Sequence, residues 1–210
     1  MKLRIDLHLH TTNSADSYVR FEDAIRRCRE ENLDGFAVTD HDILTEIPGQ
    51  AHEESNLIIL PGVEVTARGA HVLAFDISEP IPPGLSIPET VEKIHDQRGI
   101  AIIAHPYSVF RTWVNQREIG DAGFDCVEVL NAHQFPLRMM LKKNISLAEK
   151  LGLPHTGGSD AHIPKTVGRA YTIVEAETRD AEDVLSAIRN GHTSYEGGGI
   201  SILERLKLRV

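Results

Sequence analysis

The chain has 210 residues, of which 41% are hydrophobic and 25% charged, a composition that excludes a largely disordered protein. Its apolar runs fall well short of the ~20 residues of a membrane-spanning helix, so we expect no membrane partner. With 22 basic against 31 acidic side chains, the net charge of −9 disfavours non-specific nucleic-acid binding. Cys28 and Cys126 are isolated, which excludes a thiolate zinc site. No secretory signal follows Met1, so we expect a cytoplasmic protein.

Short apolar runs alternate with amphipathic segments along the chain. Hydrophobic periodicity predicts strands at 3–9, 35–39, 57–65, 71–75, 100–104, 126–130, 155–158 and 170–174, and helices at 21–32, 88–98, 136–151 and 180–190. This alternation predicts βαβ units in a mostly parallel sheet. Seven or eight such units favour a compact, irregular barrel, which we expect to form one domain over residues 1–210. A doubly wound open sheet is the alternative, but no GxGxxG motif marks its dinucleotide-binding form.

One connection is too short for a parallel crossover. Residues 66–69 separate two strand-like runs, whereas a crossover needs a dozen or more residues. The two runs are therefore expected to form an antiparallel hairpin. A turn centred between Ala67 and Arg68 would place Glu64 directly opposite His71, with Cβ atoms ~5 Å apart. In a parallel strand His71 would lie at the wrong end, and Asp76 would be the candidate instead.

Metal-ligand residue types recur where the predicted strands end. The carboxyl ends of strands in an α/β barrel converge on one rim, so distant residues meet in one cavity. The candidates are six histidines and three carboxylates: His8, His10, His41, His71, His105, His162, Asp16, Glu64 and Asp160. Imidazole and carboxylate together suit manganese, zinc or iron. Nine ligands could hold three divalent ions and leave open positions, which is typical of a catalytic site.

Five segments carry these residues in a fixed order: Asp6-Leu-His-Leu-His-Thr, Val38-Thr-Asp-His-Asp, Pro61-Gly-Val-Glu-Val, Ala104-His-Pro and Gly158-Ser-Asp-Ala-His. In this the chain resembles the polymerase and histidinol phosphatase (PHP) family. The resemblance implies an α/β fold, a distorted (β/α)7-like barrel, and hydrolysis of phosphoesters with up to three metal ions. It implies one ion on His8, His10, Glu64 and Asp160, a second on Glu64, His71 and His105, and a third on Asp16, His41 and His162.

The expected reaction is hydrolysis of a small phosphomonoester, such as a nucleotide, by attack of a metal-bridged hydroxide on phosphorus. Glu64 and Asp160 would be the catalytic carboxylates, because they hold the ions that activate the water. The alternative is a nuclease or phosphodiesterase that acts on short oligonucleotides with the same trinuclear site. A non-catalytic metal or nucleotide sensor is a third class. The oligomeric state stays open.

Further residues near the predicted rim are candidates for substrate contact. His133 could protonate the leaving oxygen, while Asn131, Lys165 and Arg169 could bind the substrate. Three aspartates beside the predicted ligands, Asp6, Asp40 and Asp42, could accept hydrogen bonds from imidazole N–H groups and so fix their tautomers. Glu128 lies within a predicted strand and is a candidate for the barrel interior rather than the site.

Overall fold

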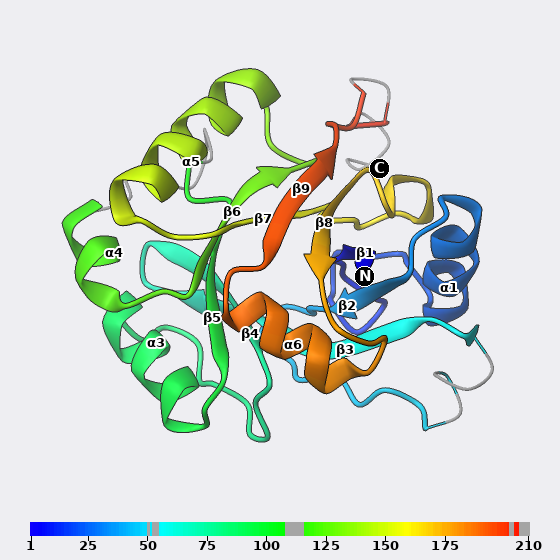
Figure 1. The fold of residues 1–210 in the computed structure, drawn as a ribbon, viewed down its shortest axis with the longest axis horizontal. Helices are drawn as coiled ribbons and strands as arrows, with labels where there is room; N and C mark the ends of the chain where they lie inside the picture. Colours follow the sequence, from blue (N-terminus) through cyan, green and yellow to red (C-terminus); the bar gives the residue numbers. More distant parts are fainter. Residues whose placement is uncertain (50, 52–54, 108–115, 202–203, 206–210) are drawn as a thin grey trace.

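One sheet of nine strands organises the part of the chain that the computed structural model describes, residues 1–49, 51, 55–107, 116–201 and 204–205 (Figure 1). The strands are β1 (Lys2–Asp6), β2 (Gly35–Val38), β3 (Ile58–Ala67), β4 (Ala70–Phe75), β5 (Ile100–Ala104), β6 (Cys126–Asn131), β7 (His155–Gly158), β8 (Ala170–Glu175) and β9 (Thr193–Gly197). The helices are α1 (Phe21–Glu30), α3 (Ile87–Asp96), α4 (Gln116–Ala122), α5 (Leu137–Leu151) and α6 (Ala181–Arg189), with a 3-10 turn, η1 (Pro164–Thr166).

The sheet curves into a nearly closed barrel, with the strand order β7-β6-β5-β4-β3-β2-β1-β8-β9. The β7 end of the sheet closes against β8, next to the other end, where the Thr172 hydroxyl of β8 exchanges hydrogen bonds with the backbone of Gly157 in β7, at 2.9 and 2.8 Å. The segments that follow β1 and β7 also pair. Asp160 N donates to His8 O at 2.7 Å, and His10 N donates to Ala161 O at 3.1 Å. Residues about 150 positions apart therefore lie side by side at one rim.

Most of the described strands run in one direction, as a mostly parallel sheet requires, and two run against them. β1, β2 and β3 run parallel, as do β5, β6 and β7. β4 is antiparallel to both its neighbours, and β8 is antiparallel to β1 and to β9. β4 and β8 run opposite to the other strands because the turn after β3 and the segment 159–169 reverse the chain with no α-helix to carry it back. The distorted (β/α)7-like barrel itself is confirmed.

The barrel interior is apolar toward the amino ends of its parallel strands. There Ile5, Phe75 and Ile100 pack with Val184 and Ile188, which α6 contributes. α6 therefore covers this end of the barrel, while α1 packs on one outer flank and α3, α4 and α5 on the other (Figure 1). The carboxyl end is left for polar side chains, as the convergence of strand ends predicts.

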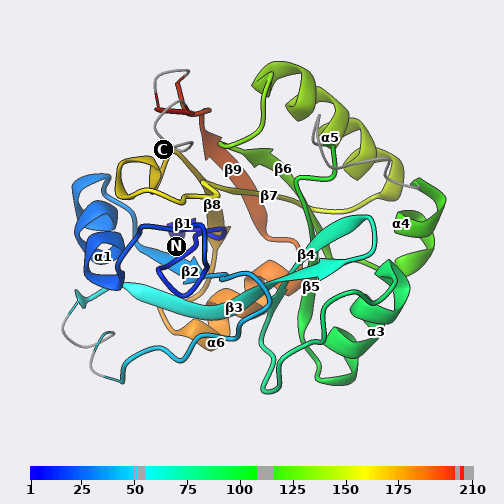
Figure 2. The ribbon, with the colours of Figure 1, turned by 180° about the vertical axis from the view of Figure 1, so that it is seen from behind.

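The predicted hairpin is confirmed, but its register is shifted by two residues. Glu64 lies opposite Leu73, and His71 lies opposite Thr66 (β3 and β4 are in front in Figure 2). The turn is centred between Arg68 and Gly69, because Gly69 adopts φ +90°, which a side chain would disfavour. Glu64 and His71 are consequently diagonal neighbours on one face. Glu64 also lies inside β3, three residues before its end.

Within the described residues, the sequence analysis did not predict strand β9 or helix α4. β9 has the sequence Thr-Ser-Tyr-Glu-Gly and is partly or fully exposed along its length, so no apolar run marks it. α4 has only seven residues, too few for a helical period to stand out. The other predicted strands and helices are present, with ends that differ by at most three residues.

Candidate metal centre

The segment that continues β1 brings two histidines to the middle of the rim. His8 and His10 are fully buried, and their i, i+2 spacing in an extended chain puts both rings on one face. Their Nε2 atoms lie 3.1 Å apart. Two ligands of one tetrahedral ion bound at ~2.0–2.1 Å would lie about 3.4 Å apart. The pair is thus arranged to share an ion.

Glu64 stands at the centre of the histidines. Five ring nitrogens lie within 3.5 Å of its carboxylate: His71 Nδ1 (2.7 Å) and His105 Nε2 (2.9 Å) from Oε1, and His41 Nδ1 (2.9 Å), His10 Nε2 (3.3 Å) and His8 Nε2 (3.5 Å) from Oε2. This carboxylate is buried, and among the described residues no donor near its Oε2, His41 Nδ1 included, has the geometry of a hydrogen bond. A buried carboxylate oxygen that lacks a donor and faces several imidazole nitrogens fits a bridging metal ligand.

Asp160 approaches the same histidines from the other side. Its Oδ1 lies 3.3 Å from His10 Nε2 and 3.6 Å from His8 Nε2. Both Asp160 and His105 have positive φ values, +52° and +30°. Left-handed backbone at non-glycine residues is uncommon and concentrates at functional sites. Here it turns both side chains toward the cluster just where their strands end.

The remaining predicted ligands form a more open flank. Asp16 Oδ2 lies 3.4 Å from His162 Nε2 and 3.7 Å from His41 Nε2. His162 Nδ1 meets the Asp160 carbonyl at 2.9 Å, which leaves Nε2 to face Asp16. Burial alone would lower the pKa of His162, but Asp16 and Asp160 outweigh it and raise that pKa to about 9.

The charges at the buried centre are strongly coupled. Burial would lower the pKa of His8, but Glu128, Asp160 and Glu64 raise it well above its ordinary value. Burial lowers the pKa of the adjacent His10 to about 4. Burial would raise the pKa values of Glu64 and Asp160, yet the surrounding histidines, His8 foremost, hold both well below their usual range. The centre therefore keeps ionised carboxylates beside imidazoles that cannot all be protonated, which suits a bound cation.

The structure brings all nine predicted ligands into this one cluster. Several triplets have ligand atoms within 4.8 Å of one another and could hold a metal ion: His8–His10–Glu64, His41–Glu64–His71, His10–His41–His162, His8–His105–Asp160 and His133–Asp160–His162. Asp76, the alternative to His71, instead pairs with Arg189 at 2.8 Å. The number and identity of the ions stay predictions.

Comparison with known proteins decides the family. A model of the PHP-associated family matches residues 141–193. The uncharacterized protein MJ1587 of Methanocaldococcus jannaschii is 30% identical over 143 residues, which are 62% of this chain and 83% of that protein. A Bacteroides vulgatus two-domain protein containing a predicted PHP-like metal-dependent phosphoesterase superposes with a TM-score of 0.74 at 20% identity, covering 94% of this chain and 65% of that one.

The chain belongs to the PHP family.

A second solved structure of similar fold is the lesion-specific endonuclease PfuEndoQ from Pyrococcus furiosus. It superposes with a TM-score of 0.68 at 18% identity, and the match covers 93% of this chain and 58% of that one. The PHP chain described here thus spans less than two thirds of either solved protein. At these identities the likeness shows a shared fold.

Glu128 is a site residue of this PHP chain that sequence reasoning missed. It is buried on β6, and its Oε1 lies 2.9 Å from His8 Nδ1. Its Oε2 accepts from His105 N at 2.7 Å and from Asn131 Nδ2 at 3.1 Å. The carboxylate therefore orients one histidine ring, the backbone of another and an amide. Its position three residues before Asn131 at the end of a strand was the available signal.

The three aspartates expected to hold imidazole N–H groups do other work. Asp40 accepts from Thr11 N, Thr11 Oγ1, Ser14 Oγ and Thr45 Oγ1, and it reaches His10 only through Ser14, 3.3 Å from His10 Nδ1. Asp42 accepts from Thr66 N. Asp6 accepts from backbone N–H groups of His8, Ser159 and Gly168, and burial raises its pKa to about 6. The expected role in fixing tautomers was wrong for these residues, because their carboxylates instead accept hydrogen bonds from backbone N–H and hydroxyl groups.

The predicted substrate contacts have protein partners in this structure. Asn131 donates to Asp160 Oδ2 at 3.2 Å as well as to Glu128, and its Oδ1 accepts from His133 N at 2.9 Å. Arg169 and Lys165 face Glu204, at 2.7 and 3.6 Å. His133 lies beside the cluster, with Nδ1 3.8 Å from Asp160 Oδ2. Binding of substrate by these residues stays a prediction.

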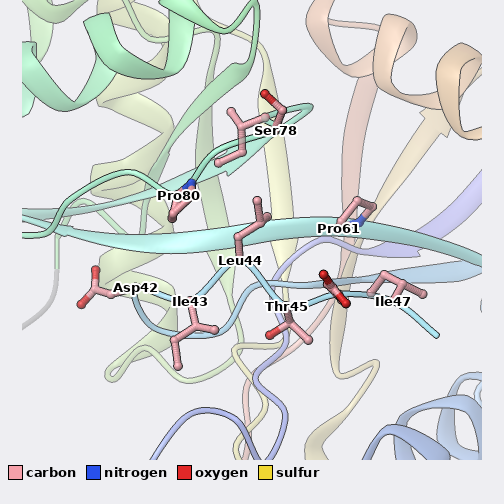
Figure 3. A pocket seen from close by; sticks show the side chains of 10 residues that line it. Asp42, Ile43, Leu44, Thr45, Ile47, Pro61, Ser78 and Pro80 are labelled. Atoms are coloured by element: carbon pink, nitrogen blue, oxygen red, sulfur yellow. The ribbon is translucent and has the colours of Figure 1, made fainter.

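A separate recess lies outside the barrel. A groove of about 690 Å³ runs over the outer face of β3, between residues 42–47 and 77–80, with Leu44, Pro61 and Pro80 among its lining (Figure 3). None of the nine predicted ligands lines it.

Among the described residues, every helix is too short or too polar to cross a lipid bilayer.

Proposed function

We propose that this chain is a metal-dependent phosphoesterase that hydrolyses a small phosphomonoester, such as a nucleotide, and that residues 1–210 act as one domain. The observation that carries the proposal is the buried Glu64 carboxylate, whose oxygens face five imidazoles and whose Oε2 lacks a hydrogen-bond partner among the described residues. Membership of the PHP family and the phosphoesterase fold of the Bacteroides protein support it.

The nine clustered residues divide into three proposed ion sites, of which the first two share Glu64. The first uses His8, His10, Glu64 and Asp160; the second Glu64, His71 and His105; the third Asp16, His41 and His162. Manganese, zinc or iron fits this mixture of imidazole and carboxylate. When bound, such ions supply a nucleophilic hydroxide at neutral pH and neutralise charge on the phosphoryl oxygens.

The protein's own groups set the geometry of the reaction. Glu128 and Asn131 hold His8 and Asp160 in place, which fixes where the phosphoryl group can sit. His133 stands at the edge of the cluster with its ring a third exposed, placed to give a proton to the leaving oxygen. Burial lowers the pKa of His133, so at neutral pH its ring would need a proton from solvent or from the nucleophile in each turnover.

The second candidate is a nuclease or phosphodiesterase that acts on short oligonucleotides at the same site. The likeness to the endonuclease PfuEndoQ favours it. The net charge of −9 favours the small phosphomonoester, because a long nucleic acid needs a basic surface.

Product analysis in manganese buffer separates these functions. Mononucleotides and short oligonucleotides are supplied side by side to the wild type and to Glu64→Gln. Free phosphate from mononucleotides alone would support the phosphomonoesterase, and mononucleotides released from oligonucleotides would support the nuclease. Glu64→Gln should lose at least ~10³-fold in activity, since it removes the shared ligand. A wild type that holds metal but cleaves neither substrate would indicate a metal or nucleotide sensor.

A further inference from the structure

Arg205 grips the loop that carries His133. Its guanidinium donates to three consecutive backbone carbonyls: His133 O at 2.5 Å, Gln134 O at 2.8 Å and Ala132 O at 3.4 Å. The same group lies over the Phe135 ring, 5.2 Å from its centroid. A planar guanidinium suits this role because its donors form a rigid fork, whereas an ammonium offers one point of contact.

Residues 200, 201 and 204, which neighbour Arg205 in the sequence, contact two loops at the rim. Ile200 N donates to Ala132 O at 3.0 Å, beside the Arg205 contacts. Glu204 is buried, accepts from Ser201 N at 2.8 Å, and pairs with Arg169 on the segment that follows His162. Residues 200, 201, 204 and 205 thus tie the loop after β6 to the loop after β7. Both loops carry members of the candidate centre.

The ring of His133 depends on its backbone for its position. Its Nδ1 lies 3.8 Å from Asp160 Oδ2, and its centroid lies 5.6 Å from that of His162. Within the described part of the chain, no hydrogen bond restrains the ring itself, while its backbone N donates to Asn131 and its backbone O accepts from Arg205. The position of this backbone therefore sets the point from which the ring reaches the cluster.

We propose that Arg205 is a positioning residue that holds His133 over the edge of the candidate metal centre, so that residues 200, 201, 204 and 205 complete the active site. This rests on the proposed function, because the role of His133 is to protonate the leaving oxygen. Loss of Arg205 frees the loop, and the ring then samples positions from which the leaving oxygen is out of reach.

Leaving-group dependence tests the proposal. p-Nitrophenyl phosphate needs little help from an acid, whereas an alkyl phosphate needs a proton on its leaving oxygen. His133→Ala should slow the alkyl ester by ~10²-fold and the aryl ester much less. Arg205→Ala should show the same preference, at about 10-fold, mainly in kcat. The double variant should be no slower than His133→Ala alone. Arg205→Lys should recover only part of the loss.

Arg179→Ala is the matched control, because Arg179 also donates to backbone carbonyls, those of Asp34 and Asn56, away from the predicted ligands. It should leave leaving-group dependence unchanged. Additive losses in the double variant, or an Arg205→Ala variant that slows both esters equally, would overturn the proposal.

The NMR resonance of the His133 ring tests its positioning by Arg205 independently of phosphoesterase activity. In the zinc-loaded protein, the ring resonance of His133, identified by its loss in His133→Ala, should shift or broaden in Arg205→Ala but not in Arg179→Ala. An inactive wild type would refute the phosphoesterase, and this spectrum would still decide the positioning of His133. An unchanged resonance in Arg205→Ala would refute the positioning.

Discussion

The candidate centre has a buried half and an exposed half, and they are built differently. His8, His10 and Glu64 are at most 1% exposed and come from β3 and the direct continuation of β1. The side chains of Asp16, His41 and His133 are 59%, 26% and 33% exposed and come from loops. Strands of one sheet hold side chains more rigidly than loops do. The buried half is therefore suited to hold ions tightly, and the exposed half to admit substrate and exchange an ion.

The two halves also differ in their support. In the buried half His8 contacts Glu128, and His10 reaches Asp40 through Ser14. On the loop side of the centre, the His162 ring contacts a backbone carbonyl, and the backbone of His133 accepts a hydrogen bond from Arg205. Carboxylate partners raise the basicity of a metal-bound imidazole and fix its ring. We therefore expect metal binding to weaken most when the residues that support the buried half, such as Glu128, are substituted.

Glu128→Gln should have the largest effect. An amide cannot accept from His8 on one side and from His105 N and Asn131 on the other, because one of its two positions becomes a donor. We expect metal affinity and activity to fall by ~10–100-fold. Metal content after gel filtration and activity against added manganese would measure it. Glu92→Gln, on the exposed face of α3, is the control. Unchanged metal content in Glu128→Gln would contradict the supporting role.

Asp16→Asn should have a smaller effect, of about 10-fold or less on metal retention, because it removes one exposed ligand. It also removes the carboxylate that does most to raise the pKa of His162. In metal-free protein that pKa should fall from about 9 toward its ordinary 6.5, so the ring loses its proton at lower pH. An NMR titration of the histidine rings would follow the change. Asp76→Asn is the control, and loss of metal there would show that the second site was placed wrongly.

Glu204→Gln should have the smallest effect, a modest loss of thermal stability. It tests whether a buried carboxylate outside the predicted ligands affects metal binding. Hydrogen bonds from Ser201, followed by Arg169, outweigh the effect of burial and lower the pKa of Glu204 to about 2. Its stabilisation is therefore present above its ordinary pKa of 4.5 and is lost as pH falls toward about 2. At pH 7 we expect Tm to drop by about 2–4 °C. For a chain of this size, that shift corresponds to a loss of about 1 kcal/mol in the free energy of unfolding.

The difference in Tm between wild type and Glu204→Gln should shrink below pH 4.5, as thermal unfolding across pH would show. Glu175→Gln, which breaks an exposed pair with Lys2, should change little. A difference that grows on acidification would show that the carboxylate is not held by its donors. Metal content should be unchanged in both variants.

Local pattern was enough to predict most of the fold. Apolar runs such as 35–38 and 100–104 mark buried strands, because burial on both faces requires continuous apolar residues. β9 escaped since its exposed residues need no such run. The hairpin was evident from a connection too short for a crossover. Its register was not, because that depended on which two residues formed the turn.

The residue types at the strand ends were likewise enough to predict the nine clustered side chains. Ligand chemistry is a property of the side chain, and the convergence of strand ends is a property of any such barrel. What those side chains meet was decided only by the tertiary structure. Glu128 supports His8, Asn131 supports Asp160, and Glu204 takes Arg169 and Lys165. Such pairings join residues up to 120 positions apart, and hydrogen bonding and charge select them only once the chain has folded.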